Sequence, residues 1–106
     1  MMARNQKDID QLVKSVVEAV KPLKIILFGS AARDDATIES DVDFLVVMPE
    51  GIHRRETARY LYRHLGATGI PVDILVATPS DLERHKNNIG LIYRTVLSEG
   101  KEIYAS

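Results

Sequence analysis

The chain has 106 residues, of which 45% are hydrophobic and 27% are charged, as in a folded soluble protein rather than a disordered one. This length predicts a single domain over residues 1–106 with one modest core. A formal net charge of −1 argues against a protein that binds nucleic acid mainly by neutralising phosphates, so nucleic acid is not expected as the main partner. The sequence has no cysteine, which excludes disulfides and thiolate metal sites and fits a reducing compartment.

The hydrophobic segments are short. The longest apolar run, residues 44–48, is far too short to cross a bilayer, and the N-terminus lacks the apolar stretch of a signal peptide. We therefore expect no membrane association and a cytoplasmic protein.

The first predicted element is an amphipathic helix. Apolar residues recur at helical spacing over residues 9–20. Asp8 and Gln11 have the spacing of a capping pair at its start, and Pro22 is expected to end it.

Three short apolar runs predict strands. Residues 24–28 form the first and lead into Gly29. Residues 41–47 form the second, in which acidic and apolar residues alternate before a wholly apolar half, and Pro49 follows it. Residues 72–76 form the third. Strands alternating with helices predict an α/β fold with helices packed on a small sheet.

Further helices are predicted between and after these strands. Residues 53–65 form one, with Ala58, Leu61 and Leu65 facing inward and an arginine stripe on another face, at Arg55, Arg59 and Arg63. Another begins near Pro79, where Ser80 and Glu83 match a capping box. Residues 87–90 interrupt it, residues 91–99 continue as a helix, and residues 103–104 add a short final strand.

Three aspartates carry the candidate chemistry. Asp41 and Asp43 are two residues apart on a strand and so point to the same side. Adjacent carboxylates repel each other unless a cation lies between them. Asp73 stands near the start of the third strand, and it joins the other two if the second and third strands are neighbours. Such a cluster suits Mg²⁺ or Mn²⁺. The alternative is a solvated acidic strand end.

A candidate phosphate site precedes the aspartates. Gly29 and Ser30 follow the first strand, where glycine allows close approach of the backbone to an anion and helix-start amides donate to phosphate. Ser30 adds a hydroxyl and Arg33 a charged donor. The alternatives are an N-cap role for Ser30 and a surface position for Arg33.

These residues together resemble a known signature. Gly29-Ser30, ten intervening residues, Asp41-Val42-Asp43 and a later strand with Asp73 are similar to the DNA polymerase β-like nucleotidyltransferase superfamily. Within it, the similarity is to the minimal nucleotidyltransferase (MNT) group, and it extends over nearly the whole chain. The resemblance implies a small mixed sheet with helices packed on it, as in the polymerase β palm.

The resemblance also implies roles for these residues. Asp41 and Asp43 would hold two ions of Mg²⁺ or Mn²⁺, and Asp73 would complete the site facing the attacking hydroxyl. Gly29 and Ser30 would contact the triphosphate of the donor, which is expected to be ATP. The reaction would move AMP to an acceptor hydroxyl.

The resemblance further implies a partner. Proteins of this group often pair with a HEPN-type toxin and neutralise it, by adding AMP to a tyrosine hydroxyl and by binding it directly. A homo- or hetero-oligomer is therefore possible. One position departs from the family pattern: Asp34 stands where the group usually has glycine after Ala-Arg. Two alternatives remain open, namely an antitoxin that acts by docking alone and a nucleotide-binding regulator without turnover.

Other polar residues are assigned no function. The arginine stripe predicts a solvated helix face; the alternative is a surface that touches a partner or a nucleic acid. The three histidines have no ligand spacing and are expected at the surface, at His53, His64 and His85. The four tyrosines are expected to pack rather than to stack on bases, at Tyr60, Tyr62, Tyr93 and Tyr104.

Overall fold

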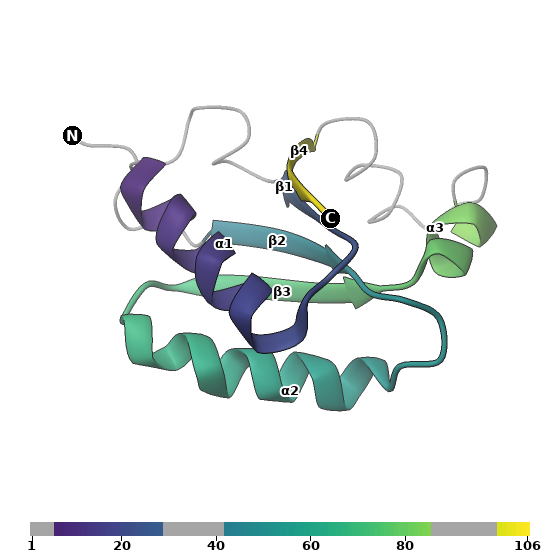
Figure 1. Ribbon diagram of the computed structural model, residues 1–106, viewed down its shortest axis with the longest axis horizontal. Helices are drawn as coiled ribbons and strands as arrows, with labels where there is room; N and C mark the ends of the chain where they lie inside the picture. Colours follow the sequence, from purple (N-terminus) through teal and green to yellow (C-terminus); the bar gives the residue numbers. More distant parts are fainter. Residues whose placement is uncertain (1–5, 29–41, 86–99) are drawn as a thin grey trace.

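The computed structural model describes residues 6–28, 42–85 and 100–106 (Figure 1). The elements follow in the order α1 (Gln6–Val20), β1 (Lys24–Phe28), β2 (Val42–Val47), α2 (Arg54–Leu65), the 3₁₀ turn η2 (Gly66–Thr68), β3 (Val72–Ala77), α3 (Pro79–His85) and β4 (Lys101–Ala105). The interruption predicted at residues 87–90 and the helix predicted at residues 91–99 lie outside the described residues. The predicted strands, the helix after β2 and the short final strand are confirmed.

The strands form one mixed sheet in the order β3-β2-β1-β4. β1 is antiparallel to both of its neighbours, β2 and β4, whereas β2 and β3 run parallel. A parallel pair needs a crossover connection, and α2 provides it between β2 and β3. The expected α/β fold with a small mixed sheet is confirmed.

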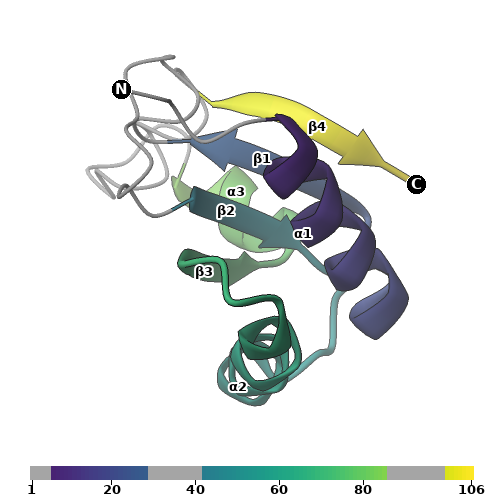
Figure 2. The same ribbon diagram turned by 90° about the vertical axis from the view of Figure 1, so that its left-hand side faces the viewer.

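The two faces of the sheet bury different sets of side chains. On β2, Val42, Phe44 and Val46 pack in the main core with α1 and α2. Leu45 and Val47 point to the opposite face, which Leu82 of α3 helps to cover. Figure 2 shows α1 and α3 on opposite sides of the sheet and α2 beside β3. Because side chains alternate along a strand, Asp43 belongs to the face of Leu45 and not to the main core.

The first helix starts earlier than the sequence predicts. α1 includes Gln6, so Asp8 lies within the first turn and cannot be the residue that caps it. The predicted capping pair of Asp8 and Gln11 is therefore wrong. An acid in the first turn of a helix is favourable because it lies beside the helix-start amides. Aspartate therefore fits the first turn as well as the cap position. The end is confirmed: after Val20, Lys21 has a φ of 50° and its amide donates to the Val17 carbonyl at 3.0 Å.

The helix between β2 and β3 has a clear inner and outer face. Leu61 and Leu65 are fully buried, whereas the three residues of the arginine stripe are exposed. His53 is exposed, as predicted, but it is also the N-cap residue, because its Nδ1 accepts a hydrogen bond from the Glu56 amide at 3.3 Å. Gly69 has a φ of 73°, a left-handed conformation that favours glycine at the end of the following turn.

The start of α3 differs from the prediction by two residues. The capping box joins Thr78 and Asp81, not Ser80 and Glu83. The Thr78 amide donates to Asp81 Oδ2 at 3.0 Å, and the Asp81 amide donates to Thr78 Oγ1 at 3.3 Å. The reason is that Pro79 occupies the first helical position, where its missing N–H is not needed, so the cap is the residue before it.

The described helices are all short. α1 is the longest of them, with 15 residues, whereas a membrane-spanning helix needs about 20. None of the described helices combines the length and apolar character needed to cross a membrane.

Candidate functional site

Two of the predicted site residues lie directly beside each other. Asp43 on β2 and Asp73 on β3 are partners in the parallel register, each at the second position of its strand. The adjacency of these two strands, on which convergence of the aspartates depends, is thus confirmed. Both side chains belong to the face of the sheet opposite the main core. Neighbouring strands lie about 4.8 Å apart, so the two carboxylates share one site.

A hollow of about 350 Å³ opens at this point. It is lined by Phe28 at the end of β1, by Asp43, and by Asp73, Ile74 and Leu75 of β3. Phe28 pairs with Asp43 across the antiparallel ladder. Three neighbouring strands therefore contribute to the hollow: β1 by its last residue, and β2 and β3 by residues near their starts.

The charge of the pair favours a cation. Two carboxylates on adjacent strands raise each other's energy when both are ionised, and a bound cation removes this penalty. Their oxygens are hard ligands of the kind that Mg²⁺ and Mn²⁺ prefer. Asp73 is exposed and Asp43 is half-buried, so an ion has access from solvent. The two residues therefore fit the proposed metal chemistry.

Tyr62 of α2 reaches the same site from the edge of the sheet. Its hydroxyl lies 3.1 Å from Asp73 Oδ1 and accepts a hydrogen bond from the Ile74 amide at 2.9 Å. The packing role expected for Tyr62 is incomplete, because the residue is 43% exposed and its hydroxyl bonds to a candidate site residue. The sequence carried a partial signal: Asp73 is an acid within an apolar strand, and such an acid requires a partner.

The remaining predicted site residues lie outside the described residues, at Gly29, Ser30, Arg33 and Asp41. Asp34, the departure from the family pattern, lies there as well. The roles of these residues as phosphate and metal ligands remain predictions. In the sequence, Gly29 directly follows Phe28 and Asp41 directly precedes Val42, so the described strands lead to both segments.

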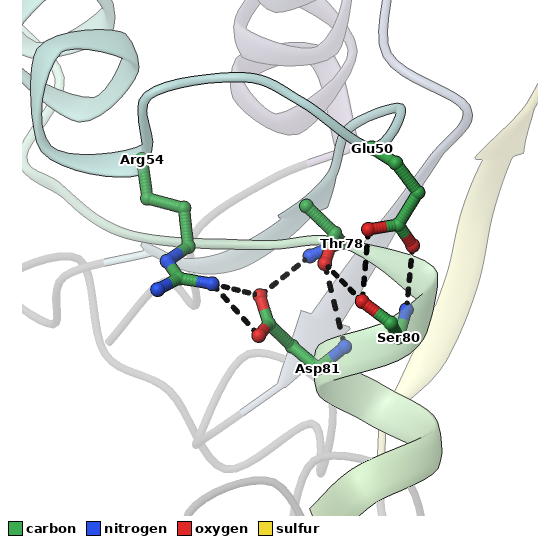
Figure 3. A network of polar contacts seen from close by, with 5 residues as sticks. All are labelled: Glu50, Arg54, Thr78, Ser80 and Asp81. Atoms are coloured by element: carbon green, nitrogen blue, oxygen red, sulfur yellow. Dashed lines mark hydrogen bonds and ion pairs between the residues drawn. The ribbon is translucent and has the colours of Figure 1, made fainter.

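A second polar cluster occupies the other end of the parallel pair, after the last residues of β2 and β3 (Figure 3). Asp81 is only 5% exposed, and the Arg54 guanidinium donates to both of its carboxylate oxygens at 2.7 Å. Glu50 accepts two hydrogen bonds from Ser80, from its amide and from its hydroxyl, each at 2.8 Å. These contacts join the loop after β2 to the starts of α2 and α3.

The contacts in this second cluster lower the pKa of both carboxylates. Burial alone would raise the pKa of Asp81, but the hydrogen bonds from Thr78 and Arg54 outweigh it, and the pKa lies below its ordinary value. The hydrogen bonds from Ser80 hold the pKa of Glu50 below its ordinary value as well. Both groups are therefore ionised at neutral pH and act as structural acceptors.

Solved structures share this fold. A chain in the structure of a toxin–antitoxin with AMP-PNP has a TM-score of 0.61 and 21% identity, covering 97% of this chain and 75% of that one. A chain in the structure of a tri-AMPylated Shewanella oneidensis HEPN toxin in complex with an MNT antitoxin has a TM-score of 0.59 and 19% identity, covering 95% and 72%. The fold is that of nucleotidyltransferases.

Sequence comparison gives the family. The chain belongs to the nucleotidyltransferase domain family, whose model matches residues 9–102. A solved structure inferred to be a minimal nucleotidyltransferase is 27% identical, with a TM-score of 0.56, and covers 87% of this chain and 85% of that one. The resemblance to the minimal nucleotidyltransferase group is thus confirmed. No curated protein matches the chain.

Proposed function

We propose that this protein transfers AMP from ATP to a hydroxyl group of a partner protein, a HEPN-type toxin that it neutralises. The observation that carries the proposal is the register pair of Asp43 and Asp73 at the hollow beside the end of β1. Family membership supports nucleotidyl transfer as the reaction class. The metals are inferred from the chemistry of these residues, whereas the donor and the acceptor are suggested by the related complexes.

Asp41, Asp43 and Asp73 are the residues that would hold Mg²⁺ or Mn²⁺. When bound, two ions would neutralise charge on the triphosphate and on the attacking oxygen, which is the main requirement of phosphoryl-group chemistry. The support is the donor set itself: hard carboxylate oxygens of Asp43 and Asp73 on neighbouring strands, on one face and open to solvent.

The remaining residues position the reactants. Gly29 and Ser30 would hold the triphosphate, with Arg33 as a charged donor. Asp73 would accept a hydrogen bond from the acceptor hydroxyl and so orient it. The hydroxyl oxygen would form a bond to the α-phosphorus in line with the bond to pyrophosphate. That bond would break, pyrophosphate would leave with the bonding electrons, and the hydroxyl proton would pass to the Asp73 carboxylate. Positioning of this kind supplies much of the rate enhancement in such reactions.

The proposed partner comes from the related complexes. One related structure contains a tri-AMPylated HEPN toxin with an MNT antitoxin, and another is a toxin–antitoxin with AMP-PNP. These facts concern those proteins, which are 19% and 21% identical to this chain. They support the proposal but are not observations on this chain. The proposal for this chain is that its acceptor is likewise a hydroxyl on a HEPN-type protein.

The test is labelling with α-labelled nucleoside triphosphates. The protein is incubated with Mg²⁺ or Mn²⁺, each nucleotide in turn, and either a purified HEPN-type protein from the same source or an extract of the source cell. We expect label from ATP on the HEPN-type protein, dependent on metal and lost in Asp43→Asn. Glu102→Gln is the matched control, because it also changes a carboxylate to an amide but lies on β4, at the other edge of the sheet.

Two outcomes separate the proposal from its alternatives. If no protein or RNA acquires label while Asp43→Asn still neutralises the partner, the chain acts by docking alone, and Asp34 becomes the first residue to examine. If ATP binds saturably without release of pyrophosphate, the chain is a nucleotide-binding regulator. Label on RNA alone would keep the reaction class but reject the protein acceptor.

A further inference from the structure

Tyr62 stands where the edge of the sheet meets the candidate metal site. It lies on α2 between buried Leu61 and the exposed stripe, and its hydroxyl extends to β3, the edge strand of the described sheet. There it accepts a hydrogen bond from the Ile74 amide at 2.9 Å and lies 3.1 Å from Asp73 Oδ1. One hydroxyl thus joins the backbone of β3 to the side chain of the preceding residue.

The Tyr62 hydroxyl can donate to only one acceptor at a time, so the acceptor that receives its proton has to be identified. A tyrosine hydroxyl has one proton to donate. Among the described residues, the acceptors near it include Asp73 Oδ1 at 3.1 Å and the Ile74 carbonyl at 3.4 Å. The carboxylate is both closer and charged, and hydrogen bonds to charged acceptors are the stronger ones. The proton therefore goes to Asp73, while the oxygen is held by the Ile74 amide.

We propose that Tyr62 is a positioning residue that sets the orientation of the Asp73 carboxylate in the hollow that it shares with Asp43. This inference rests on the proposed function, in which Asp73 is a metal ligand. A carboxylate on an exposed edge strand otherwise rotates freely between staggered conformations. The bond from Tyr62 engages Oδ1 and is itself anchored to the main chain through Ile74, so it selects one of these conformations.

The expected effect is on metal affinity as well as on catalysis. Removing a residue that orients a metal ligand typically lowers metal affinity or activity by about 10- to 100-fold. Tyr62→Phe keeps the ring and removes only the hydroxyl. We expect it to weaken Mn²⁺ binding by about 10-fold, measured by electron paramagnetic resonance on the intact chain, and to lower kcat with little change in the KM for nucleotide.

Tyr60→Phe provides the matched control. Tyr60 lies on the same helix and is 47% exposed, but its ring stacks on His64 at a centroid distance of 5.9 Å. This substitution also removes a phenolic hydroxyl, but one that bonds to no aspartate among the described residues. We expect Mn²⁺ affinity in Tyr60→Phe to equal that of the unmodified protein.

A double-mutant cycle tests whether Tyr62 acts through Asp73. If it does, Tyr62→Phe has no further effect on the residual Mn²⁺ affinity of Asp73→Asn. Equal effects of Tyr62→Phe in both backgrounds would overturn the proposal. Should Tyr62→Phe fold poorly, the test uses the unmodified protein labelled with ¹³C at tyrosine Cζ. Saturating Mg²⁺ should shift the Tyr62 resonance and leave that of Tyr60 in place, and no shift at Tyr62 would reject the assignment.

The outcomes distinguish this inference from the proposed function. If the unmodified protein binds no Mn²⁺ and Asp43→Asn changes nothing, both fail. If the unmodified protein binds Mn²⁺ in an Asp43-dependent way and Tyr62→Phe binds it equally well, only the role of Tyr62 fails. Mass spectrometry of protein incubated with ATP and Mg²⁺ provides a further check, since AMP attached to Tyr62 itself would make it an acceptor and overturn its assignment as a positioning residue.

Discussion

The parallel strands β2 and β3 have carboxylates at both ends, and the surroundings of these carboxylates differ between the two ends. Near the start, Asp43 and Asp73 face each other across the register, beside the hollow. After the end, Asp81 and Glu50 are each held by donors, namely an arginine, a backbone amide or a hydroxyl. At the first end the two carboxylates share a hollow that can admit a cation, and Tyr62 donates to Asp73. At the second end Arg54 supplies a positive partner for Asp81 from the chain itself.

This difference shows how to separate structural acids from candidate catalytic ones. An acid that stabilises the fold has donors that match its oxygens, and its pKa falls, as for Asp81 and Glu50. Carboxylates that lie beside each other at a hollow favour a bound cation, which is typical of functional sites. Substitution of an acid that is held by donors should therefore lower stability, whereas substitution of an acid at the hollow should lower activity.

The largest expected effect concerns activity at the start of the strands. Asp43→Asn should lower nucleotidyl transfer by about 10²–10³-fold, because it removes a ligand charge where transition-state charge develops. The unfolding free energy should change by less than about 0.5 kcal/mol, because asparagine has nearly the shape of aspartate and Asp43 lies outside both hydrophobic clusters. Paired measurements of label transfer and urea unfolding check both parts. A loss of activity accompanied by an equally clear loss of stability would mean that Asp43 is a structural acid.

The second effect concerns stability at the other end. Asp81→Asn should lower the unfolding free energy by about 1–2 kcal/mol, because it weakens the capping box and the bond from Arg54. The ion pair itself adds modestly, since the Arg54 side chain is 55% exposed and water screens it. Urea unfolding at neutral pH gives the value. If the unfolding free energy is unchanged within about 0.3 kcal/mol, Asp81 is not a structural acid and the two ends of the strands do not differ in this respect.

The sequence predicts most of the fold because its elements have strong, regular patterns. β1 occupies the predicted residues, α2 begins one residue after the predicted start with its cap at His53, and the alternation on β2 places Val42 and Phe44 in the core. The caps of α1 and α3 were misplaced, since several polar residues near each start satisfy the same spacing rule. At α3 the deciding residue is Pro79, which occupies the first helical position and makes Thr78 the cap.

Part of the site could be predicted, because the strands that carry it have regular sequence patterns. Spacing along one strand places two aspartates on one face, but the pairing of Asp43 with Asp73 depends on strand order, which the sequence states only by family resemblance. Tyr62 could not be assigned, because its partner is eleven residues away and the contact depends on how α2 packs beside β3. Long-range contacts of this kind leave no local periodicity to detect.

The third effect sharpens the contrast through pH. Because the folded-state pKa of Asp81 lies below its ordinary value of about 3.9, its contribution is complete above that value and is lost as pH falls through the folded-state pKa. The difference in unfolding free energy between the unmodified protein and Asp81→Asn should therefore be constant from about pH 5 to 7 and shrink below about pH 4. Using the difference removes the parallel titration of Glu50. A difference that persists to pH 2 would show that Asp81 acts by shape and not by charge.

The smallest effect is expected at Glu50. Its carboxylate accepts both bonds from Ser80, but it is exposed, so water competes for the same donors. Glu50→Gln keeps one acceptor oxygen and should lower the urea midpoint by less than Asp81→Asn does. Salt should reduce the effect further, because exposed charges are screened. Urea titrations of both variants at low and high ionic strength test this order. Equal destabilisation by Glu50→Gln and Asp81→Asn would contradict this order. It would mean that the contact between the loop after β2 and α3 stabilises this end as much as the contacts of Asp81 do, and that burial of Asp81 does not distinguish the two carboxylates.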